Sequence, residues 1–139
     1  MTKQIRNAIT DRIYGHFGDD YNIEIESKEQ GFETPCFFVQ MLETQEIAKP
    51  MNRYLLINPV KIVYFPKSEY EPMDECYEVQ SDLKDLLHYI TLADRTTLRG
   101  TDIRTMIVGK QLHAFVNYDF YATKNKETSE KMGVLERRR

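Results

Sequence analysis

The sequence predicts an α+β fold: a mainly antiparallel sheet of about five strands with two helices packed on one face, in the order α-β-β-β-α-β-β. Three observations lead to it. Two stretches carry apolar residues at helical spacing, several short stretches alternate apolar and polar residues, and the chain has 139 residues of which 41% are hydrophobic. A chain of this size builds one core. We expect a single domain over residues 1–122 and a charged C-terminal tail over residues 123–139.

The first predicted element is a helix over residues 5–17, where isoleucine or phenylalanine recurs every fourth residue and forms one apolar stripe. Gly18 follows as a helix-ending residue. Residues 22–26 then place Ile23 and Ile25 on the inner side and glutamates on the outer side. This period of two predicts a half-buried strand.

Two further strands are predicted at residues 36–43 and 53–65, because both stretches are rich in aromatic and β-branched residues. The polar residues 27–35 are expected to form the loop before the first of them, and a break at residues 48–52 separates the two. Pro59 deletes one ladder donor from the second strand, so we expect a bend there, at a sheet edge or a bulge.

The second helix is predicted to begin at Pro72 and to carry an apolar stripe from Cys76 to Ile90 at spacings near three and four. Its polar side carries four acidic residues at spacings of four, four and three, which stack as a like-charge stripe. The stripe is either an ordinary solvated face or a surface that meets a basic partner. Its members are Asp74, Glu78, Asp82 and Asp85.

The junction between the third strand and this helix is crowded with aromatic residues, and the sequence leaves open whether they are core or the anchor of an interface. They are Tyr64, Phe65, Tyr70 and Tyr77.

A hairpin is predicted to close the domain, with one strand at residues 103–110, a tight turn at Gly109 and Lys110, and a second strand from Leu112 to Phe120. Apolar residues occupy alternate positions of the second strand, which indicates one buried face.

The charge changes sign between body and tail. Residues 1–122 hold 13 Lys and Arg against 19 Asp and Glu, whereas residues 123–139 hold six against three. An acidic body repels phosphate backbones, so we do not expect the main domain to bind nucleic acid. The tail ends in three arginines that could meet the acidic stripe of the second helix, namely Arg137, Arg138 and Arg139.

We expect a cytoplasmic protein, because no apolar run is long enough for a membrane span and the first residues lack the apolar segment of a secretory signal. The two cysteines, Cys36 and Cys76, lie within apolar patterns and are expected to be free thiols.

Catalytic motifs are weak, which predicts a protein that is not an enzyme and has no cofactor or metal. Ser81 has Lys84 three residues on but lacks the partner motifs of a serine hydrolase, and no glycine-rich phosphate loop occurs. Cys76 and His88 are twelve residues apart on one helix, about 18 Å, which no zinc ion spans. The histidines are expected to be structural; they are His16, His88 and His113.

The sharpest enzymatic alternative is a Mg²⁺-dependent nuclease. Glu26, Ser27 and Lys28 place an acid-x-Lys after a strand, an arrangement that can hold Mg²⁺ and a water when an upstream acid joins it. The available acids, Asp19 and Asp20, lie in the turn before the same strand, so convergence on one ion is not favoured.

A set of short sequence motifs in a fixed order distinguishes this sequence from other α+β domains. They are Gln30 to Phe38, Arg53-Tyr54, Tyr64-Phe65-Pro66, Leu98-Arg99-Gly100 and Val116 to Phe120. In this order, over roughly residues 1–125, the chain resembles the small tail-terminator proteins of contractile-tailed phages, prophages and phage-tail-like bacteriocins of low-GC Gram-positive bacteria.

The resemblance implies a structural protein of virion assembly. Such a terminator forms a ring, typically of six subunits, on the last ring of the tail tube, stops polymerisation and offers the surface that joins the head. The implied partners are further copies of itself and the tube protein, with the sheath or the head–tail connector as others. The protein would be cytoplasmic during assembly and then part of the particle. The other hypotheses are a stand-alone dimeric α+β binding or regulatory domain and the nuclease.

Overall fold

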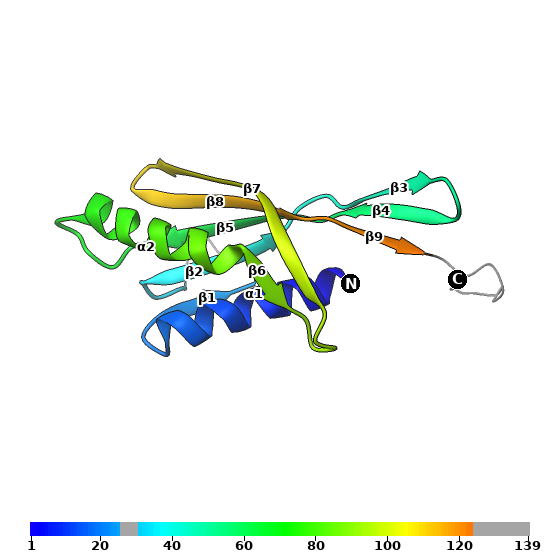
Figure 1. Ribbon diagram of the computed structural model, residues 1–139. Coiled ribbons are helices and arrows are strands. Elements are labelled where there is room, and N and C mark those ends of the chain that lie inside the picture. The colour runs from blue at the N-terminus through cyan, green and yellow to red at the C-terminus, as the bar shows by residue number, and fades with distance from the viewer. Residues whose placement is uncertain (26–30, 124–139) are drawn as a thin grey trace.

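The computed structural model of the protein describes residues 1–25 and 31–123 (Figure 1). The described elements are α1 (Thr2–Phe17), β1 (Asn22–Glu24), β2 (Cys36–Met41), β3 (Gln45–Lys49), β4 (Arg53–Ile57), β5 (Pro59–Phe65), α2 (Pro72–Leu87), β6 (Tyr89–Thr91), β7 (Thr97–Val108), β8 (Gln111–Tyr118) and β9 (Phe120–Thr123).

Six strands form one sheet in the order β1-β2-β5-β8-β7-β6, and three form a second in the order β3-β4-β9. The β1–β2 pair is parallel and the other pairs are antiparallel. Both helices pack on one face of the six-stranded sheet, so the predicted α+β class is confirmed. We call the six-stranded sheet with its two helices the body, and the three-stranded sheet, which extends beyond it in Figure 1, the arm.

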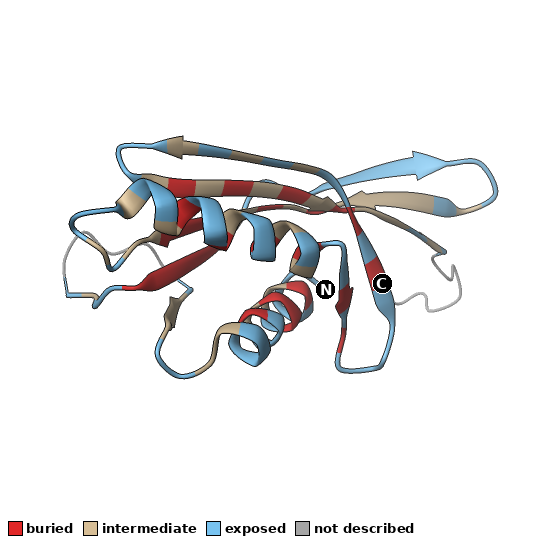
Figure 2. Ribbon diagram, turned by 60° about the vertical axis from the view of Figure 1, so that its left-hand side comes forward, coloured by how far each residue is buried: buried red, intermediate tan, exposed pale blue. Residues whose placement is uncertain are grey.

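The core lies between the helices and the sheet of the body (Figure 2). The apolar stripes of α1 and α2 meet alternate residues of β2, β5 and β8, because successive side chains of a strand point to opposite faces. The largest fully buried side chains include Ile5, Ile9, Ile13, Phe37, Ile62, Tyr64, Leu83, Leu87, Leu112 and Tyr118.

Both helix predictions are confirmed with small changes at their ends. Gly18 ends α1 at φ 85°, and its N–H donates to the carbonyl of Tyr14 at 2.9 Å. Pro72 is in the first turn of α2, as expected. The helix ends at Leu87, and Ile90, which we placed on its stripe, belongs to β6.

The first strand is shorter than predicted. β1 ends at Glu24, so Ile25 lies beyond the paired residues and is exposed, and its inward placement was wrong. The loop expected at residues 27–35 falls partly outside the described residues.

The stretch 53–65, predicted as one bent strand, is two strands in different sheets. The chain crosses from the arm to the body at Asn58, which is buried and donates from Nδ2 to the carbonyl of Tyr118 at 3.0 Å. The Tyr118 N–H donates to the carbonyl of Asn58, also at 3.0 Å. The predicted strand 112–120 divides at the same level, because Asp119 separates β8 from β9.

The bend at Pro59 is therefore confirmed, but the edge position is wrong. β5 lies between β2 and β8 in the middle of the sheet. Pro59 is tolerated because it is the first residue of the strand, where its missing N–H interrupts little of the ladder. Its carbonyl still accepts from Leu42 N at 2.9 Å.

Besides β6, two regions carry strand residues that the sequence analysis did not predict. β3 lies partly in the predicted break at residues 48–52, and all five of its residues are exposed, so it has no burial pattern to detect. β7 begins at Thr97, six residues before the predicted start at residue 103. The turn predicted at Gly109 and Lys110 is confirmed, with φ 58° and 64°.

Gly100 in β7 is required by close packing against α2. A Cβ at this position would lie 2.2 Å from the carbonyl oxygen of Leu87. The same carbonyl accepts from the hydroxyl of Tyr118 at 2.8 Å. The end of α2 is thus fixed on the sheet where β8 passes into the arm.

Candidate assembly surfaces

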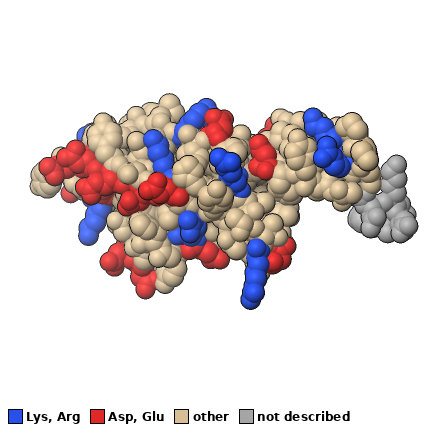
Figure 3. Space-filling view, viewed as in Figure 1, with Lys and Arg blue, Asp and Glu red and all other residues tan. Residues whose placement is uncertain are grey.

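The acidic stripe predicted on the second helix is present on α2. Its four carboxylates, from Asp74, Glu78, Asp82 and Asp85, are exposed. Asp82 Oδ2 lies 3.4 Å from His16 Nε2 of α1, and both side chains are about half exposed. Figure 3 shows the acidic side chains gathered over the helical end of the molecule.

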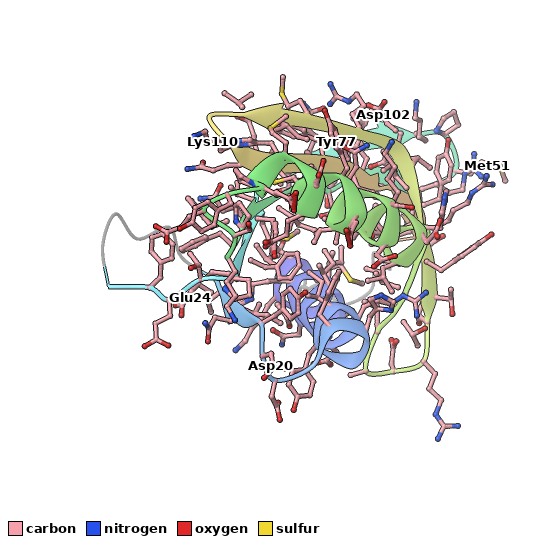
Figure 4. The ribbon with its side chains drawn as sticks, turned by 90° about the vertical axis from the view of Figure 1, so that its left-hand side faces the viewer. Asp20, Glu24, Met51, Tyr77, Asp102 and Lys110 are labelled. Atoms are coloured by element: carbon pink, nitrogen blue, oxygen red, sulfur yellow. The ribbon has the colours of Figure 1, made fainter. Side chains whose placement is uncertain are left out.

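Apolar side chains lie beside these carboxylates. Met73 and Tyr77 are 39% and 54% exposed on α2, and their spacing from Asp74 and Glu78 places them on one side of the helix. In Figure 4, Tyr77 and Lys110 lie on the opposite side of the view from Asp20 and Glu24. We call the surface formed by Met73, Asp74, Tyr77, Glu78, Ser81, Asp82 and Asp85 the α2 face.

The aromatic residues at the junction of β5 and α2 divide into core residues and exposed residues, the two roles that the sequence left open. Tyr64 is fully buried and Phe65 is half-buried, whereas Tyr70 and Tyr77 are exposed. Burial and a hydrogen bond to Glu75 raise the pKa of the Tyr64 hydroxyl well above its usual value. Tyr64 is therefore a core residue, and the two exposed tyrosines are available for contact.

Glu75, in the first turn of α2, fixes the β5–α2 loop. Its carboxylate accepts from the backbone N–H groups of Lys67 at 2.7 Å and Ser68 at 2.9 Å, as well as from the Tyr64 hydroxyl. This side chain is thus committed to the fold, unlike the four carboxylates of the stripe.

The arm is a surface that the sequence analysis did not identify. Neither helix packs over it in the described part of the chain, and the burial colours of Figure 2 change from red in the body to tan and blue in the arm. Met51 at its tip is 89% exposed. Arg53 lies over the ring of Tyr121, with Cζ 5.2 Å from the centroid.

The face of the body sheet away from the helices carries a third group. Phe115 has Lys61 Nζ 5.9 Å and Arg104 Cζ 5.5 Å from its ring centroid. His113 is half-buried beside them, and burial, with the nearby Lys61 charge, lowers its pKa. This histidine lies on the face of β8 that points away from the helices.

The cysteines are buried, whereas His16 and His88 are exposed near the ends of their helices. Cys36 and Cys76 are free and buried, as predicted. His88 is exposed and caps the C-terminus of α2, and Ser81 is exposed on the α2 face.

The residues of the nuclease alternative are described only in part. Asp19 and Asp20 line an open polar recess with Glu33, Lys67 and Glu75. Among residues 1–25 and 31–123, no group of three or more His, Cys, Asp or Glu side chains is placed to hold a metal ion. Glu26 and Lys28 lie outside the described residues.

The candidate partners of the stripe, Arg137, Arg138 and Arg139, also lie outside the described residues, as does the tail beyond Thr123. Neither described helix has the length and apolar content needed to span a membrane.

The comparison with protein families favours one of the hypotheses. The model of the family described as phage tail terminator protein matches residues 4–130. The chain belongs to the phage tail terminator family. The family is a structural one of the phage tail, not a catalytic one, and the resemblance in the short sequence motifs is thereby confirmed. No curated protein matches the chain.

Proposed function

We propose that this phage tail terminator caps the tail tube as a ring, stops its polymerisation and offers the surface that joins the head. The observation that carries the proposal is the family match over residues 4–130. The exposed α2 face and the uncovered arm support it, because two different surfaces on one subunit allow a heterologous contact that repeats until it closes.

The proposed partners are further copies of the chain, about six in a ring, and the tube protein, with the sheath or connector as neighbours. The protein acts in the cytoplasm during assembly and remains in the particle. No step requires catalysis, a cofactor or a metal.

Removing the gene from the phage or tail-like particle tests the function directly. Tails assembled without the protein should exceed the normal length and should lack joined heads where the particle has them. Electron microscopy of purified particles measures both, with the gene supplied in trans as the control. Tails of normal length in the absence of the protein would refute the capping role.

We also propose that the C-terminal tail contributes to assembly through the acidic stripe of a neighbouring subunit or another tail protein. Its net charge of +3 is opposite to the −6 of residues 1–122. One exposed ion pair contributes only about 0 to 1 kcal/mol, so several of its basic residues would act together with its few apolar ones.

Truncation after Thr123 tests the role of the tail. The thermal unfolding midpoint of the truncated monomer should stay close to that of the full chain, while its assembly weakens. High salt should weaken full-chain assembly in the same way, because charge interactions are screened beyond about 3 Å at 1 M. Unfolding of the truncated chain would show that the tail belongs to the core.

A further inference from the structure

The arm carries an apolar row that crosses all three of its strands. Ile47 of β3 pairs with Leu55 of β4, and Leu55 pairs with Tyr121 of β9, so the three side chains share one face. Ile47 is 38% and Tyr121 59% exposed. A three-stranded sheet depends on a hydrophobic face that packs against something. The row therefore has the character of a contact surface.

Two cations border this row on the same face. Lys49 and Arg53 lie directly opposite each other in the β3–β4 pair, two residues from Ile47 and Leu55. Like charges in directly opposite positions destabilise a sheet, and a carboxylate placed against them would remove the repulsion. The face thus fits a partner that is both apolar and acidic.

The α2 face has that composition. Met73 and Tyr77 supply exposed apolar area, and the four carboxylates of the stripe repel one another along the helix. Each surface therefore carries an internal repulsion that the other can relieve, and each carries apolar area that the other can cover.

We infer that the arm of one subunit docks on the α2 face of a second copy of this chain. The apolar row of the arm packs against Met73 and Tyr77, and Lys49 and Arg53 meet the acidic stripe. This inference rests on the proposed function, because it supplies the contact that the ring requires.

The start of α2, which carries Met73 and Tyr77, lies far from the arm of the same subunit, and this favours a contact between subunits. The start of α2 lies beside the β7–β8 turn, where Cys76 Sγ is 3.9 Å from the carbonyl oxygen of Lys110. The arm begins after the far end of β8, eight residues away, or about 25 Å at roughly 3.3 Å per residue. Figures 1 and 3 show the arm, with its basic side chains, extending away from the acidic end. A head-to-tail contact of this kind closes into a ring when its rotation allows.

Charge exchange between two full-length variants tests the inference. The arm variant carries Lys49→Glu and Arg53→Glu, and the helix variant carries Glu78→Lys and Asp82→Lys. Alone, each presents like charges at the contact, so its self-association should be at least about tenfold weaker than that of the wild type. When the two variants are mixed in equal amounts, the arm of each variant meets opposite charges on the α2 face of the other. The mixture should assemble more strongly than either variant alone, with alternating subunits, as measured by sedimentation velocity.

Matched single reversals elsewhere provide the controls. Lys3→Glu on α1 and Asp20→Lys before β1 change exposed charges outside both surfaces, so neither should alter assembly or rescue a variant. Thermal unfolding of each variant shows that it is folded. The inference is overturned if the mixture self-associates no more strongly than either variant alone. It is also overturned if the arm variant self-associates as strongly as the wild type.

The same variants, supplied to particles that lack the gene, separate this inference from the proposed function. If the wild type limits tail length and both charge-reversed variants limit it equally well, the proposed function is supported and the arm contact is refuted. If the gene has no effect on tail length, the function fails while rescue by mixing still reports the contact. If the wild type is monomeric in solution, retention at tube ends replaces sedimentation as the readout, and full retention of the arm variant alone refutes the contact.

Discussion

β4 and β5 are separated by a single residue, Asn58, yet they lie in very different surroundings. In β5, Val60, Ile62 and Tyr64 are buried, because α1 and α2 cover that face of the sheet. Val63 is buried in a smaller cluster on the other face. In β4 no residue is fully buried, and its neighbour β3 is exposed throughout. The two regions have similar strands and differ in what covers them.

This difference indicates how the chain divides its apolar residues. Those of the body stabilise the fold of one subunit, whereas those of the arm have little to pack on within it. Phe120 is the exception, because it packs against the main core at the root of the arm. The outer part of the arm is therefore the region where substitutions should affect assembly more than folding.

The largest expected effect comes from comparing one leucine in each region. Leu83→Ala in α2 removes a fully buried side chain and should lower the free energy of unfolding by about 2 to 5 kcal/mol. Leu55→Ala in β4 removes a half-buried one and should lower it by only about 1 kcal/mol, while it weakens self-association. Denaturant unfolding and sedimentation measure the two effects. Equal losses of stability would mean that the arm is as much a part of the core as α2.

The body was the more predictable region because its signals are local. The stripe of α1, the proline that starts α2 and the turn at Gly109 each depend on residues a few positions apart, and each is present in the structure. The exposure of the acidic stripe followed from helical spacing alone. The contact that we propose for the stripe did not, since charge spacing does not identify a partner.

The arm was not predicted because it depends on pairing between distant segments. Tyr121 pairs with Leu55, and nothing near either residue in the sequence indicates the other. The exposed β3 lacks alternating burial. The apolar alternation of β8 continues past Asp119 into β9, and apolar residues lie on both sides of Asn58 and Pro59, so each pair of strands resembles one strand in the sequence. The tertiary hydrogen bonds of Asn58 mark the division, and a sequence pattern does not report them.

The next largest effect should come from the crossing point between the two regions. Asn58→Ala removes the Nδ2 donor to the carbonyl of Tyr118 and leaves that buried acceptor without its side-chain partner. The expected loss in the free energy of unfolding is about 1 to 3 kcal/mol. Asp119→Asn is the matched control, because its Oδ1 can still accept from the N–H of Asn58. A variant as stable as the wild type would mean that the crossing is held by backbone pairing alone.

The smallest effect should be a pH dependence confined to the body, through His113. Burial, with the nearby charge of Lys61, lowers the pKa of this imidazole below its ordinary value of 6.5. The folded chain therefore binds fewer protons than the unfolded chain once the pH falls through about 6.5, so the stabilisation is complete above that pH and decreases below it.

Thermal unfolding midpoints at pH 7.5 and pH 5.5 measure this effect. His113→Gln should reduce the fall in midpoint between the two conditions, and Lys61→Met should reduce it less, because burial is the larger cause of the shift. The arm should not contribute, since none of its described strands contains a histidine. If the variant and the wild type lose stability equally on acidification, His113 is as accessible to protons in the folded body as in the unfolded chain.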